Sequence, residues 1–392
     1  MRSVEELDVK GKTVFVRMDF NVPLLANGEI RDDTRIRASL ATIKYLIEKG
    51  ARIVLASHFG RPKGKPDPAM SLRPVAKRLG ELLGRDVAMA PDVVGPEVEA
   101  LKSALTDGGL LLLENVRFHP GETKNDPDLS RQLASGIDIF INDAFGSSHR
   151  AHSSVVGIAD FVPLKAAGFL MKDEIDYLGR AIHSPARPYV AILGGAKSED
   201  KIPVLENLVK KADQILIGGA MAYTFLKAEG RSVGRSLVED DKLETARSIM
   251  AKAARNKISF HLPVDHVLAA SVESGQVAAV VGDEPFPDGL MGVDIGPKTI
   301  AAYGAVIGAA RTIVWNGPLG VFEVPAFAQG TMAIARAVAG SNALSIVGGG
   351  DSIAAVTKAG VSDAIGHIST GGGASLEYLA YETLPGIEAL EK

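Results

Sequence analysis

Short apolar runs that alternate with helix-like stretches are the feature that most limits the fold of this chain. The runs recur at Val14–Val16, Ile53–Ala56, Leu110–Leu113, Ile137–Ile141, Val190–Leu193, Ile215–Ile217, Ile313–Trp315 and Leu344–Val347. Strands of this kind are typical of parallel sheets that helices cover on both faces. A chain of 392 residues is longer than one hydrophobic core normally accommodates. The sequence therefore predicts an α/β protein with two doubly wound, Rossmann-like parallel-sheet lobes joined by a helical hinge.

The expected lobes are residues 1–170 and 188–381, with a connecting helix and hinge at 171–187 and a tail at 382–392. The stretch Gly168–Ile182 has a helical pattern, and Pro185 and Pro188 after it prevent the helix from continuing. The sequence leaves open whether the tail returns to the N-terminal lobe. In the first lobe, Arg35–Glu48 is expected to be one amphipathic helix with Asp33 or Thr34 as its cap and with its end at Gly50.

The composition excludes several classes of protein. With 43 basic and 47 acidic residues, a net charge of −4 and 5% aromatic residues, the chain has neither the basic surface nor the stacking rings of a nucleic-acid-binding protein. It contains no cysteine, so disulfides, thiolate metal sites and a cysteine nucleophile are excluded. The N-terminus lacks an apolar signal core and no run is long enough for a membrane span. We therefore expect a cytoplasmic protein without a membrane partner.

The segments that follow the strands differ between the two halves of the chain. In the first half they are RMDFNVP, SHFGRP, ENVRFHP and NDAFGSSHRAHSS; in the second half they are GGAKSEDK, GGAMAY, NGPLGVFE, GGGDS and STGGGAS. Ligands of open α/β sheets bind beyond the carboxyl ends of the strands. The first edge supplies Arg, His, Asn and Asp and suits a small anion, whereas the second supplies backbone amides that suit a nucleotide polyphosphate.

Two glycine triplets, Gly348–Gly350 and Gly371–Gly373, each lie between an apolar run and a helix-like run. Each would expose a helix N-terminus, whose free N–H groups and partial positive charge attract phosphate oxygens. Asp351 and Ser352 are in position to cap the helix after the first triplet. Beside a polyphosphate, the Asp351 carboxylate is better suited to hold Mg²⁺ than to contact the anion. Taken alone, either triplet is more often an ordinary strand–helix turn.

Five arginines and four histidines lie in or beside the strand-exit segments of the first half, namely Arg17, Arg35, Arg61, Arg117, Arg150, His58, His119, His149 and His152. If these edges converge, as a parallel sheet predicts, they form an electropositive site that requires an anionic ligand. The alternative is a set of surface ion pairs with Asp19, Asp33 and Asp143, because such pairs are common and weak.

The common nucleotide-binding fingerprints are missing. The sequence has no G-x-x-x-x-G-K-[ST] loop, no early G-x-G-x-x-G with an acidic residue about twenty positions later, and no protein-kinase loops. Instead, Gly194-Gly195-Ala196-Lys197 ends a strand, and Lys201 lies four residues further on the same predicted helical face. Two ammonium groups there could contact phosphates, although lysines of this kind are more often solvated surface residues.

Ten blocks of the sequence resemble, in order, the motifs of the phosphoglycerate kinase family. The first is TVFVRMDFNVP at Thr13–Pro23, and the others are DDTRIRASLATI, SHFGRPKG, LLLENVRFHPGE, NDAFGSSHRAHSS, GGAKSEDKI, MGVDIGP, WNGPLGVFE, GGGDS and STGGGASLE. The resemblance extends over the whole chain, and ten ordered motifs are far more specific than a glycine loop. It implies two lobes joined by a hinge, a 3-phosphoglycerate site on the N-terminal lobe and a Mg–nucleotide site on the C-terminal lobe.

Position by position, the resemblance also implies the site residues. Those that bind the triose are Asp19, Asn21, Arg35, His58, Arg61, Arg117 and Arg150. Those that bind the nucleotide are Lys197, Lys201, Gly219, Gly292, Asn316, Pro318, Glu323, Gly348, Gly349, Gly350, Asp351 and Ser352, with Glu323 facing the ribose and Asp351 the metal. One block departs from the family pattern: Ser198-Glu199 stands where a small apolar residue and serine are usual, and Pro203 where glycine is usual, while Lys197, Asp200 and Lys201 match. We expect this departure to affect the local shape of the loop and the affinity for the nucleotide rather than the activity.

The activity that the resemblance implies is reversible, Mg-dependent phosphoryl transfer between 1,3-bisphosphoglycerate with ADP and 3-phosphoglycerate with ATP, a reaction of glycolysis and gluconeogenesis. Transfer would be direct and in line, with hinge closure, in a monomer. The nucleophile of the ATP-consuming direction is a carboxylate that is already ionised, so no general base is needed. Arg35, Lys197, Gly349 and Gly372 are the expected catalytic residues, because a guanidinium, an ammonium and backbone amides can stabilise the charge on the migrating phosphoryl group.

Two other classes of function fit the sequence less well. A dinucleotide-dependent dehydrogenase predicts an early Rossmann fingerprint, which is missing. A non-catalytic nucleotide-binding regulator would keep GGGDS and lose the basic cluster of the first half, which is intact.

Overall fold

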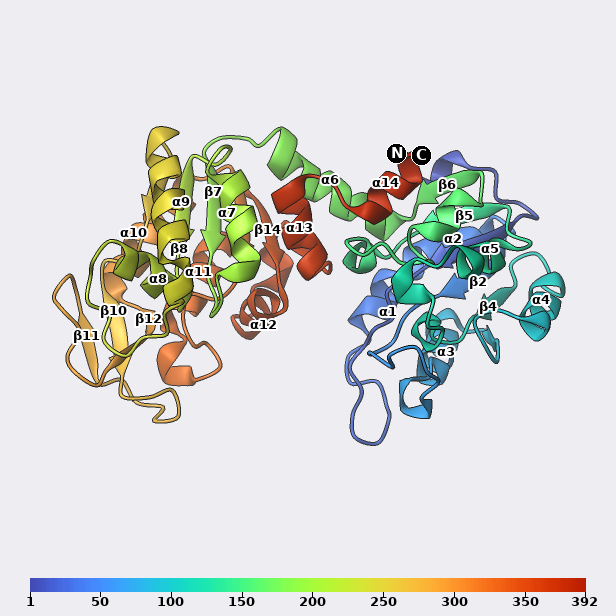
Figure 1. Ribbon diagram of the computed structural model, residues 1–392, viewed down its shortest axis with the longest axis horizontal. Helices are drawn as coiled ribbons and strands as arrows, with labels where there is room; N and C mark the ends of the chain where they lie inside the picture. Colours follow the sequence, from blue (N-terminus) through green and yellow to red (C-terminus); the bar gives the residue numbers. More distant parts are fainter. The chain divides into compact units, whose positions relative to one another are not determined.

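The computed structural model describes the backbone of residues 1–392 and every side chain except that of Asp200, so the expectation for Asp200 lies outside the described side chains. The chain divides into two compact units: unit 1 is Met1–Asp176 with Thr383–Lys392, and unit 2 is Tyr177–Glu382. The division lies within helix α6 (Phe169–His183). In unit 1, α14 (Pro385–Glu391) contacts β6 (Leu164–Ala167), and the two chain ends lie side by side (Figure 1). The hinge role of α6 stays a prediction.

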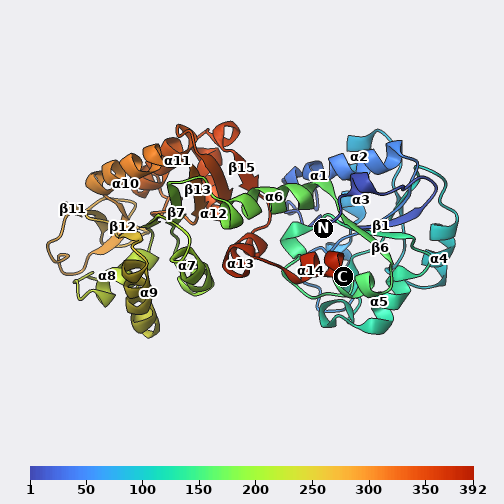
Figure 2. The same ribbon diagram turned by 90° about the horizontal axis from the view of Figure 1, so that it is seen from above.

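Unit 1 contains a six-stranded parallel sheet in the order β3-β4-β2-β1-β5-β6. Its other strands are β1 (Thr13–Arg17), β2 (Arg52–Ala56), β3 (Ala88–Met89), β4 (Leu110–Leu112) and β5 (Ile139–Asn142). Its other helices are α1 (Thr34–Ala38), α2 (Leu40–Glu48), α3 (Arg73–Leu83), α4 (Pro96–Ser103) and α5 (Pro127–Ala134). α2 and α3 cover one face of the sheet and α5 the other (Figure 2). Consecutive residues of the central strands are therefore buried, as their apolar runs predict.

Unit 2 contains a six-stranded parallel sheet in the order β15-β14-β13-β7-β8-β9 and a three-stranded antiparallel sheet in the order β11-β10-β12. The strands are β7 (Tyr189–Leu193), β8 (Gln214–Ile217), β9 (Ser259–His261), β10 (His266–Ala269), β11 (Ala279–Val281), β12 (Met291–Ile295), β13 (Thr312–Asn316), β14 (Leu344–Gly348) and β15 (His367–Ser369). The helices are α7 (Ile202–Leu208), α8 (Met221–Ala228), α9 (Leu243–Arg255), α10 (Pro297–Ala309), α11 (Gln329–Ala339), α12 (Gly350–Lys358) and α13 (Gly373–Tyr381). α10 and α11 lie on one face of the parallel sheet and α7 and α9 on the other (Figure 2).

The predicted fold class, with two doubly wound parallel-sheet lobes, is confirmed. Each of the eight apolar runs overlaps a parallel strand. The antiparallel sheet of unit 2 and the short strands β3, β6 and β9 were not predicted, because these segments lack a continuous apolar run.

The expected continuous helix over Arg35–Glu48 is wrong, because α1 ends at Ala38 and α2 begins at Leu40. The Ser39 hydroxyl donates a hydrogen bond to the Ile36 carbonyl oxygen at 2.7 Å, and such local bonds compete with the regular helical pattern. Asp33 occupies the N-cap position of α1 but makes no side-chain capping bond. The second helix ends at Glu48, two residues before Gly50, which was expected to stop it and has a left-handed φ of +72°.

Candidate active site

The polar residues expected at the first site follow the carboxyl ends of four neighbouring parallel strands of unit 1. Asp19 and Asn21 follow β1, His58 and Arg61 follow β2, Arg117 follows β4 and Arg150 follows β5, while Arg35 lies in α1. Because β4, β2, β1 and β5 are adjacent and parallel, their carboxyl ends form one edge of the sheet. The topology therefore brings together the expected site residues that follow these strands, and Arg35 is added from α1.

Hydrogen bonds connect these strand-exit segments to one another. Arg35 Nη1 lies 2.6 Å from Asp19 Oδ2. The Asn21 side-chain oxygen accepts a hydrogen bond from the Gly60 amide at 2.9 Å. Arg117 Nη1 donates to the Gly60 carbonyl oxygen at 2.8 Å. The loop after β2 is thus held from both sides by residues that follow β1 and β4.

A buried network beneath the edge orients His58. Arg17 is fully buried; its Nε donates to Ser154 Oγ at 2.8 Å, and its Nη2 lies 3.3 Å from His58 Nδ1. Ser154 Oγ in turn donates to Glu122 Oε1 at 2.6 Å. Burial holds the pKa of His58 well below its ordinary value, although the Asp19 carboxylate opposes this effect. The ring is therefore neutral at physiological pH and can act as a hydrogen-bonding group.

Three of the arginines surround a cavity of about 590 Å³. Its lining contains Arg61, Arg117, Arg150, Lys63, Lys124, His119 and His152 together with Gly64, Pro120 and Thr123. Burial lowers the pKa of Arg117 to about 10, and the charges of Arg17 and Arg150 add to the shift. Arg117 therefore stays positive at neutral pH. Lys63, Thr123 and Lys124 had not been singled out from the sequence.

The ion-pair alternative holds for only part of this cluster. Arg35 pairs with Asp19, but Asp33 binds Arg37 and Arg78. The Asp143 carboxylate accepts a hydrogen bond from the Met171 amide at 3.1 Å. Among the described side chains, no carboxylate forms an ion pair with Arg61, Arg117 or Arg150. The charges of these three side chains are therefore not balanced by an ion pair with a described carboxylate.

The second site is a cavity of about 290 Å³ in unit 2. Five of the expected nucleotide residues line it, namely Gly219, Gly292, Pro318, Glu323 and Asp351. The apolar part of its wall comes from Leu237, Val272, Met291, Leu319 and Val321. The cavity thus combines an apolar wall with exposed carboxylates of Glu323 and Asp351 at its margin.

Two of the glycines are required by the shape of this cavity. Gly219 has a φ of +64°, and a Cβ there would overlap the backbone of Gly195. A Cβ on Gly292 would overlap the phenol ring of Tyr223. At both positions a side chain would therefore close the cavity or displace its wall.

Both glycine triplets precede helices, as expected. Gly349, with a φ of +91°, is the N-cap residue of α12, and Gly372, with a φ of +55°, is that of α13. The expected capping role of Asp351 and Ser352 is wrong, because α12 has no side-chain capping bond. Ser352 Oγ instead accepts a hydrogen bond from the Gly317 amide at 2.6 Å.

Asn316 and Gly348 lie opposite one another at the ends of the paired strands β13 and β14. The Asn316 side-chain amide donates to the Gly348 carbonyl oxygen at 2.9 Å. The first triplet is thereby joined to the loop that carries Pro318, which lines the cavity. Gly350 then begins α12.

Lys197 and Lys201 were expected on one face of a helix, and this expectation is wrong. Lys197 precedes the short 3₁₀ turn Glu199–Lys201 and is exposed, whereas Lys201 belongs to that turn. Lys201 Nζ lies 3.4 Å from the position of a Cβ on Gly195, which lines the cavity. Lys197 is not among the lining residues. Pro203 lies in the first turn of α7, where the absence of an amide proton has little cost.

Sequence reasoning missed Tyr223 and Asp294 in the wall of the cavity. Asp294 Oδ2 accepts from the Gly330 amide at 2.7 Å and Oδ1 from the Ile295 amide at 2.9 Å. Burial nevertheless raises the pKa of Asp294 to about 7. An acidic residue inside the otherwise apolar stretch MGVDI was the signal that could have identified it, because carboxylates are seldom fully buried without partners.

The carboxylates near this cavity would suit a cation that is held mainly by the phosphates of a ligand. Among the described residues, no group of three or more His, Asp or Glu side chains could hold a metal ion without other ligands. Asp351 lines the cavity, is exposed and forms no ion pair with a described residue. Mg²⁺ usually keeps several waters and is bound by one or two carboxylates and the substrate phosphates, so one carboxylate beside the cavity is sufficient.

Comparisons with known proteins agree with this geometry. The family model for phosphoglycerate kinase matches residues 4–382. The chain is 56% identical to the phosphoglycerate kinase of Anaeromyxobacter sp. (strain K) over 394 residues, covering 100% of both chains. It is 57% identical to that of Solibacter usitatus (strain Ellin6076), covering 100% of this chain and 99% of the relative.

Solved structures show the same likeness. The phosphoglycerate kinase of Coxiella burnetii has a TM-score of 0.92 and 43% identity, with 99% of this chain and 98% of that chain covered. The enzyme from Pyrococcus horikoshii OT3 has a TM-score of 0.85 and 36% identity, with 100% and 98% covered. None of the helices in the described part of the chain combines the length and hydrophobicity needed to cross a membrane. The match to the family model and the full-length identity show that this chain belongs to the phosphoglycerate kinase family.

Proposed function

We propose that this chain catalyses reversible phosphoryl transfer between 1,3-bisphosphoglycerate with ADP and 3-phosphoglycerate with ATP, using the residues of the two sites described above. Transfer of a phosphoryl group to a carboxyl acceptor is the activity of the family to which the chain belongs. The observation that carries the assignment of the first site is the cluster of Arg61, Arg117 and Arg150 around one cavity, without an ion-paired carboxylate among the described side chains. Such charges require an anion, and 3-phosphoglycerate has a phosphate and a carboxylate.

In this proposal the three arginines bind the phosphate of 3-phosphoglycerate, because guanidinium groups donate parallel hydrogen bonds to phosphate oxygens. Asp19, Asn21 and His58 bind the rest of the triose. Arg35 lies at the carboxyl end of the substrate. Its guanidinium is partly exposed, with 36% of the side-chain surface accessible, so it can contact substrate while it is held by Asp19.

The cavity of unit 2 would hold the base and ribose of the nucleotide. Its apolar wall suits a flat base, since ligand pockets are mainly apolar with a few polar groups that fix orientation. Glu323 would bind the ribose hydroxyls. The phosphates would lie toward the N-termini of α12 and α13 and toward Lys197 and Lys201. Residues proposed to support this arrangement are Gly219, Gly292, Asn316, Pro318, Gly348, Gly350 and Ser352.

The reaction then depends on position and charge. The substrate carboxylate is ionised at neutral pH and needs no base. The migrating phosphoryl group carries negative charge on its equatorial oxygens. Arg35, Lys197 and the backbone amides at Gly349 and Gly372 would stabilise that charge, because preorganised donors are the largest single source of catalysis in reactions of this type. Exclusion of water would prevent hydrolysis of the nucleotide.

Asp351 is the residue that would hold Mg²⁺, which when bound would neutralise part of the phosphate charge. We propose that the enzyme is a monomer and that it is cytoplasmic, where ATP and phosphorylated acids are found. A coupled assay with ATP, Mg²⁺ and 3-phosphoglycerate tests the proposal. Formation of ADP that depends on 3-phosphoglycerate is the expected result, and the absence of turnover would contradict it. Neither a dehydrogenase nor a non-catalytic regulator would show this dependence.

A further inference from the structure

Helix α1, which carries Arg35, has little buried surface of its own to hold its first turn in place. The helix has five residues, of which only Ile36 is buried, and helices this short are not stable alone. Its N-cap residue makes no side-chain capping bond. Asp32 does accept a hydrogen bond from the Thr34 amide at 2.8 Å, but it belongs to the exposed segment that precedes the helix. The orientation of the first turn therefore depends on contacts with other elements.

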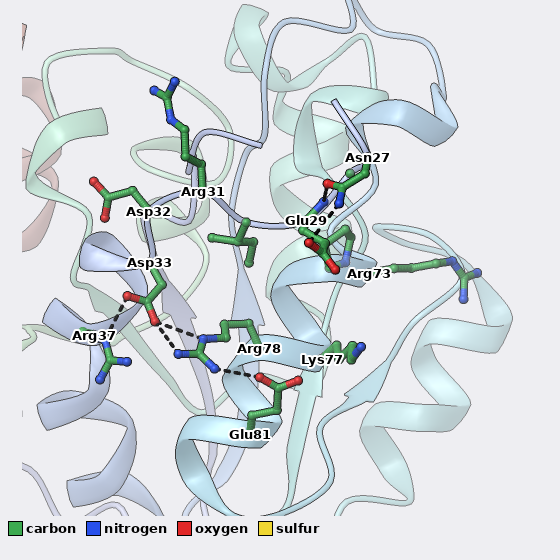
Figure 3. A pocket seen from close by; sticks show the side chains of 13 residues that line it. Asn27, Glu29, Arg31, Asp32, Asp33, Arg37, Arg73, Lys77, Arg78 and Glu81 are labelled. Atoms are coloured by element: carbon green, nitrogen blue, oxygen red, sulfur yellow. Dashed lines mark hydrogen bonds and ion pairs between the residues drawn. The ribbon is translucent and has the colours of Figure 1, made fainter. Parts of the chain in front are cut away.

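Arg78 of α3 connects this turn to the body of unit 1 (Figure 3). Its Nε and Nη2 donate to Asp33 Oδ2 at 3.0 and 2.9 Å. Asp33 Oδ1 accepts from Arg37 Nε at 2.8 Å, so one carboxylate joins α3 to α1. Arg78 Nη1 is held in turn by Glu81 Oε2 at 2.7 Å.

Helix α3, which carries Arg78, is held firmly by buried side chains. Val75 and Leu79, which lie on either side of Arg78 in α3, are almost completely buried, at 1% and 0% exposure. Both belong to the core that covers the sheet of unit 1. The position of Arg78 on α3 is therefore fixed by packing, whereas α1 has only one buried residue.

The cavity beside the pair, of about 810 Å³, does not have the character of an anion site. It is lined by acidic and basic side chains, and Arg31 points away from Arg73 and Lys77 (Figure 3). The basic groups that are free of ion pairs among the described residues do not converge on one point. These contacts indicate that the Asp33–Arg78 pair has a structural role and is not part of a ligand site.

We propose that Arg78 is a positioning residue for Arg35: by holding Asp33 it fixes the first turn of α1 and, with it, the guanidinium that lies 2.6 Å from Asp19. This inference rests on the proposed function of Arg35. Arg78 is 34% exposed and Asp33 20% exposed, and exposed ion pairs contribute little to stability. The effect of the pair is therefore on geometry, and small displacements of a reacting group are enough to slow catalysis.

The kinetic test uses Arg78→Met, which removes the donors and keeps most of the side-chain length. We expect kcat to fall about threefold to tenfold, with a smaller change in the KM for 3-phosphoglycerate. Arg78→Lys should restore part of the loss, because an ammonium can still bind Asp33. Lys77→Met is the matched control, since Lys77 is the neighbouring residue of α3, is exposed and forms no ion pair with a described residue. Its kcat should stay within about twofold of the wild type.

The double variant Arg35→Lys/Arg78→Met shows whether Arg78 acts through Arg35. If it does, Arg78→Met slows the Arg35→Lys enzyme much less than it slows the wild type, because the two residues then share one effect. Equal fold losses in both backgrounds would overturn the proposal. An unchanged kcat in Arg78→Met alone would also overturn it.

Hydrogen exchange over α1 gives a readout that does not depend on turnover. The Arg37 amide donates to the Asp33 carbonyl oxygen at 3.0 Å, and its exchange should be faster in Arg78→Met and unchanged in Lys77→Met. Unchanged exchange in Arg78→Met would show that Arg78 does not fix the turn. A wild-type protein without turnover would contradict the proposed function alone, and the exchange comparison would still decide whether Arg78 holds α1.

Discussion

The hydroxyl-bearing edge of Tyr223 lies against Gly292, so that a Cβ on residue 292 would overlap the ring. Both residues line the cavity of unit 2. Tyr223 is 4% exposed, and its ring packs on Phe286, at 5.9 Å between ring centroids, and on His266, at 5.5 Å. It has little freedom to move away, so the absence of a side chain at residue 292 determines the width of the cavity.

Gly292→Ala should therefore impair nucleotide binding. We expect the KM for ATP to rise about tenfold, which corresponds to the usual cost of forcing one extra carbon into a packed site. The KM for 3-phosphoglycerate should change little, because the site proposed for it is in unit 1. Steady-state kinetics with each substrate varied in turn measure both values.

Gly304→Ala is the matched control. Gly304 lies inside α10, and a Cβ there would meet no atom within 4 Å. This variant should keep both KM values and gain about 0.5–1 kcal/mol of stability, because alanine restricts the unfolded chain more than glycine does. An unchanged KM for ATP in Gly292→Ala would mean that the cavity does not bind the nucleotide.

Asp351→Asn should leave the fold intact and weaken the use of the Mg–nucleotide. Asparagine keeps the shape and one oxygen but loses the charge that a hard cation prefers, so we expect the Mg²⁺ concentration for half-maximal rate to rise about tenfold. Asp363→Asn is a suitable control, since Asp363 is also exposed and lies in the loop between α12 and β15. If Asp351→Asn has the Mg²⁺ dependence of the wild type, Asp351 is not the metal ligand.

His266 should make unit 2 sensitive to acid. Its side chain is 1% exposed, and neither ring nitrogen has a hydrogen-bond partner among the described residues. Burial lowers the pKa of His266 from 6.5 to about 4, and the charge of Arg231 adds to this effect. Below pH 6.5 the unfolded chain takes up a proton that the folded chain takes up only near pH 4, so the free energy of unfolding falls as the pH drops through this range.

His266→Leu should remove this part of the pH dependence. Between pH 6.5 and 4 the wild type should lose up to about 3 kcal/mol more than the variant, since each pH unit between the two pKa values contributes about 1.4 kcal/mol. At pH 7.5 the variant should be about as stable as the wild type, because two unpaired polar atoms are replaced by apolar ones. Urea unfolding followed by the fluorescence of Trp315, the single tryptophan, which is buried in unit 2, measures the difference. Parallel pH profiles would contradict the role of His266.

The parallel strands could be predicted because they are buried on both faces and therefore appear as continuous apolar runs. The antiparallel sheet could not, because β10 begins with His266 and β12 contains Asp294, and both polar residues are buried. Burial of these polar side chains depends on neighbours that are distant in the sequence, such as the Gly330 amide, which donates to Asp294. The interruption between α1 and α2 at Ser39 likewise coincides with a local side-chain hydrogen bond, which cannot be predicted from the spacing of apolar residues.

The same distinction applies to the site. Residues that directly follow parallel strands could be placed together, because the carboxyl ends of such strands share one edge. Tyr223 could not be assigned in this way, since it lies in the first turn of α8 and one sequence does not show which face of a helix borders a cavity. Lys201 was expected near phosphate, but its position close to Gly195 depends on a 3₁₀ conformation that the sequence pattern did not indicate.

Both substrates together should bring the two units closer. Arg35 belongs to unit 1 and Lys197 to unit 2, so neither unit alone contains all the proposed charge-stabilising groups. Closure would exclude water and strengthen each electrostatic contact. Solution scattering should show a smaller radius of gyration for the ternary complex than for the protein with ATP alone or 3-phosphoglycerate alone. The same radius in all states would argue against a hinge.

Arg35→Lys should depress kcat far more than it raises the KM for 3-phosphoglycerate. The substitution keeps the positive charge, but a guanidinium can donate two parallel hydrogen bonds whereas an ammonium is a compact, strongly hydrated charge. In the structure one end of the Arg35 fork is held by Asp19. The other nitrogen atoms form no ion pair with a described carboxylate, so they could donate to the migrating phosphoryl group in the proposed reaction.

In the proposed site the other arginines would still hold the ground-state anion in this variant, so the loss should be concentrated in the transition state. We expect kcat to fall about 10²–10³-fold, as when one preorganised donor is removed. Arg31→Lys is the control, because Arg31 is exposed, precedes the same helix and forms no ion pair with a described residue; its kcat should equal that of the wild type. Steady-state kinetics on both variants decide the role of Arg35: near-normal kcat with a large rise in KM would make it a binding residue only.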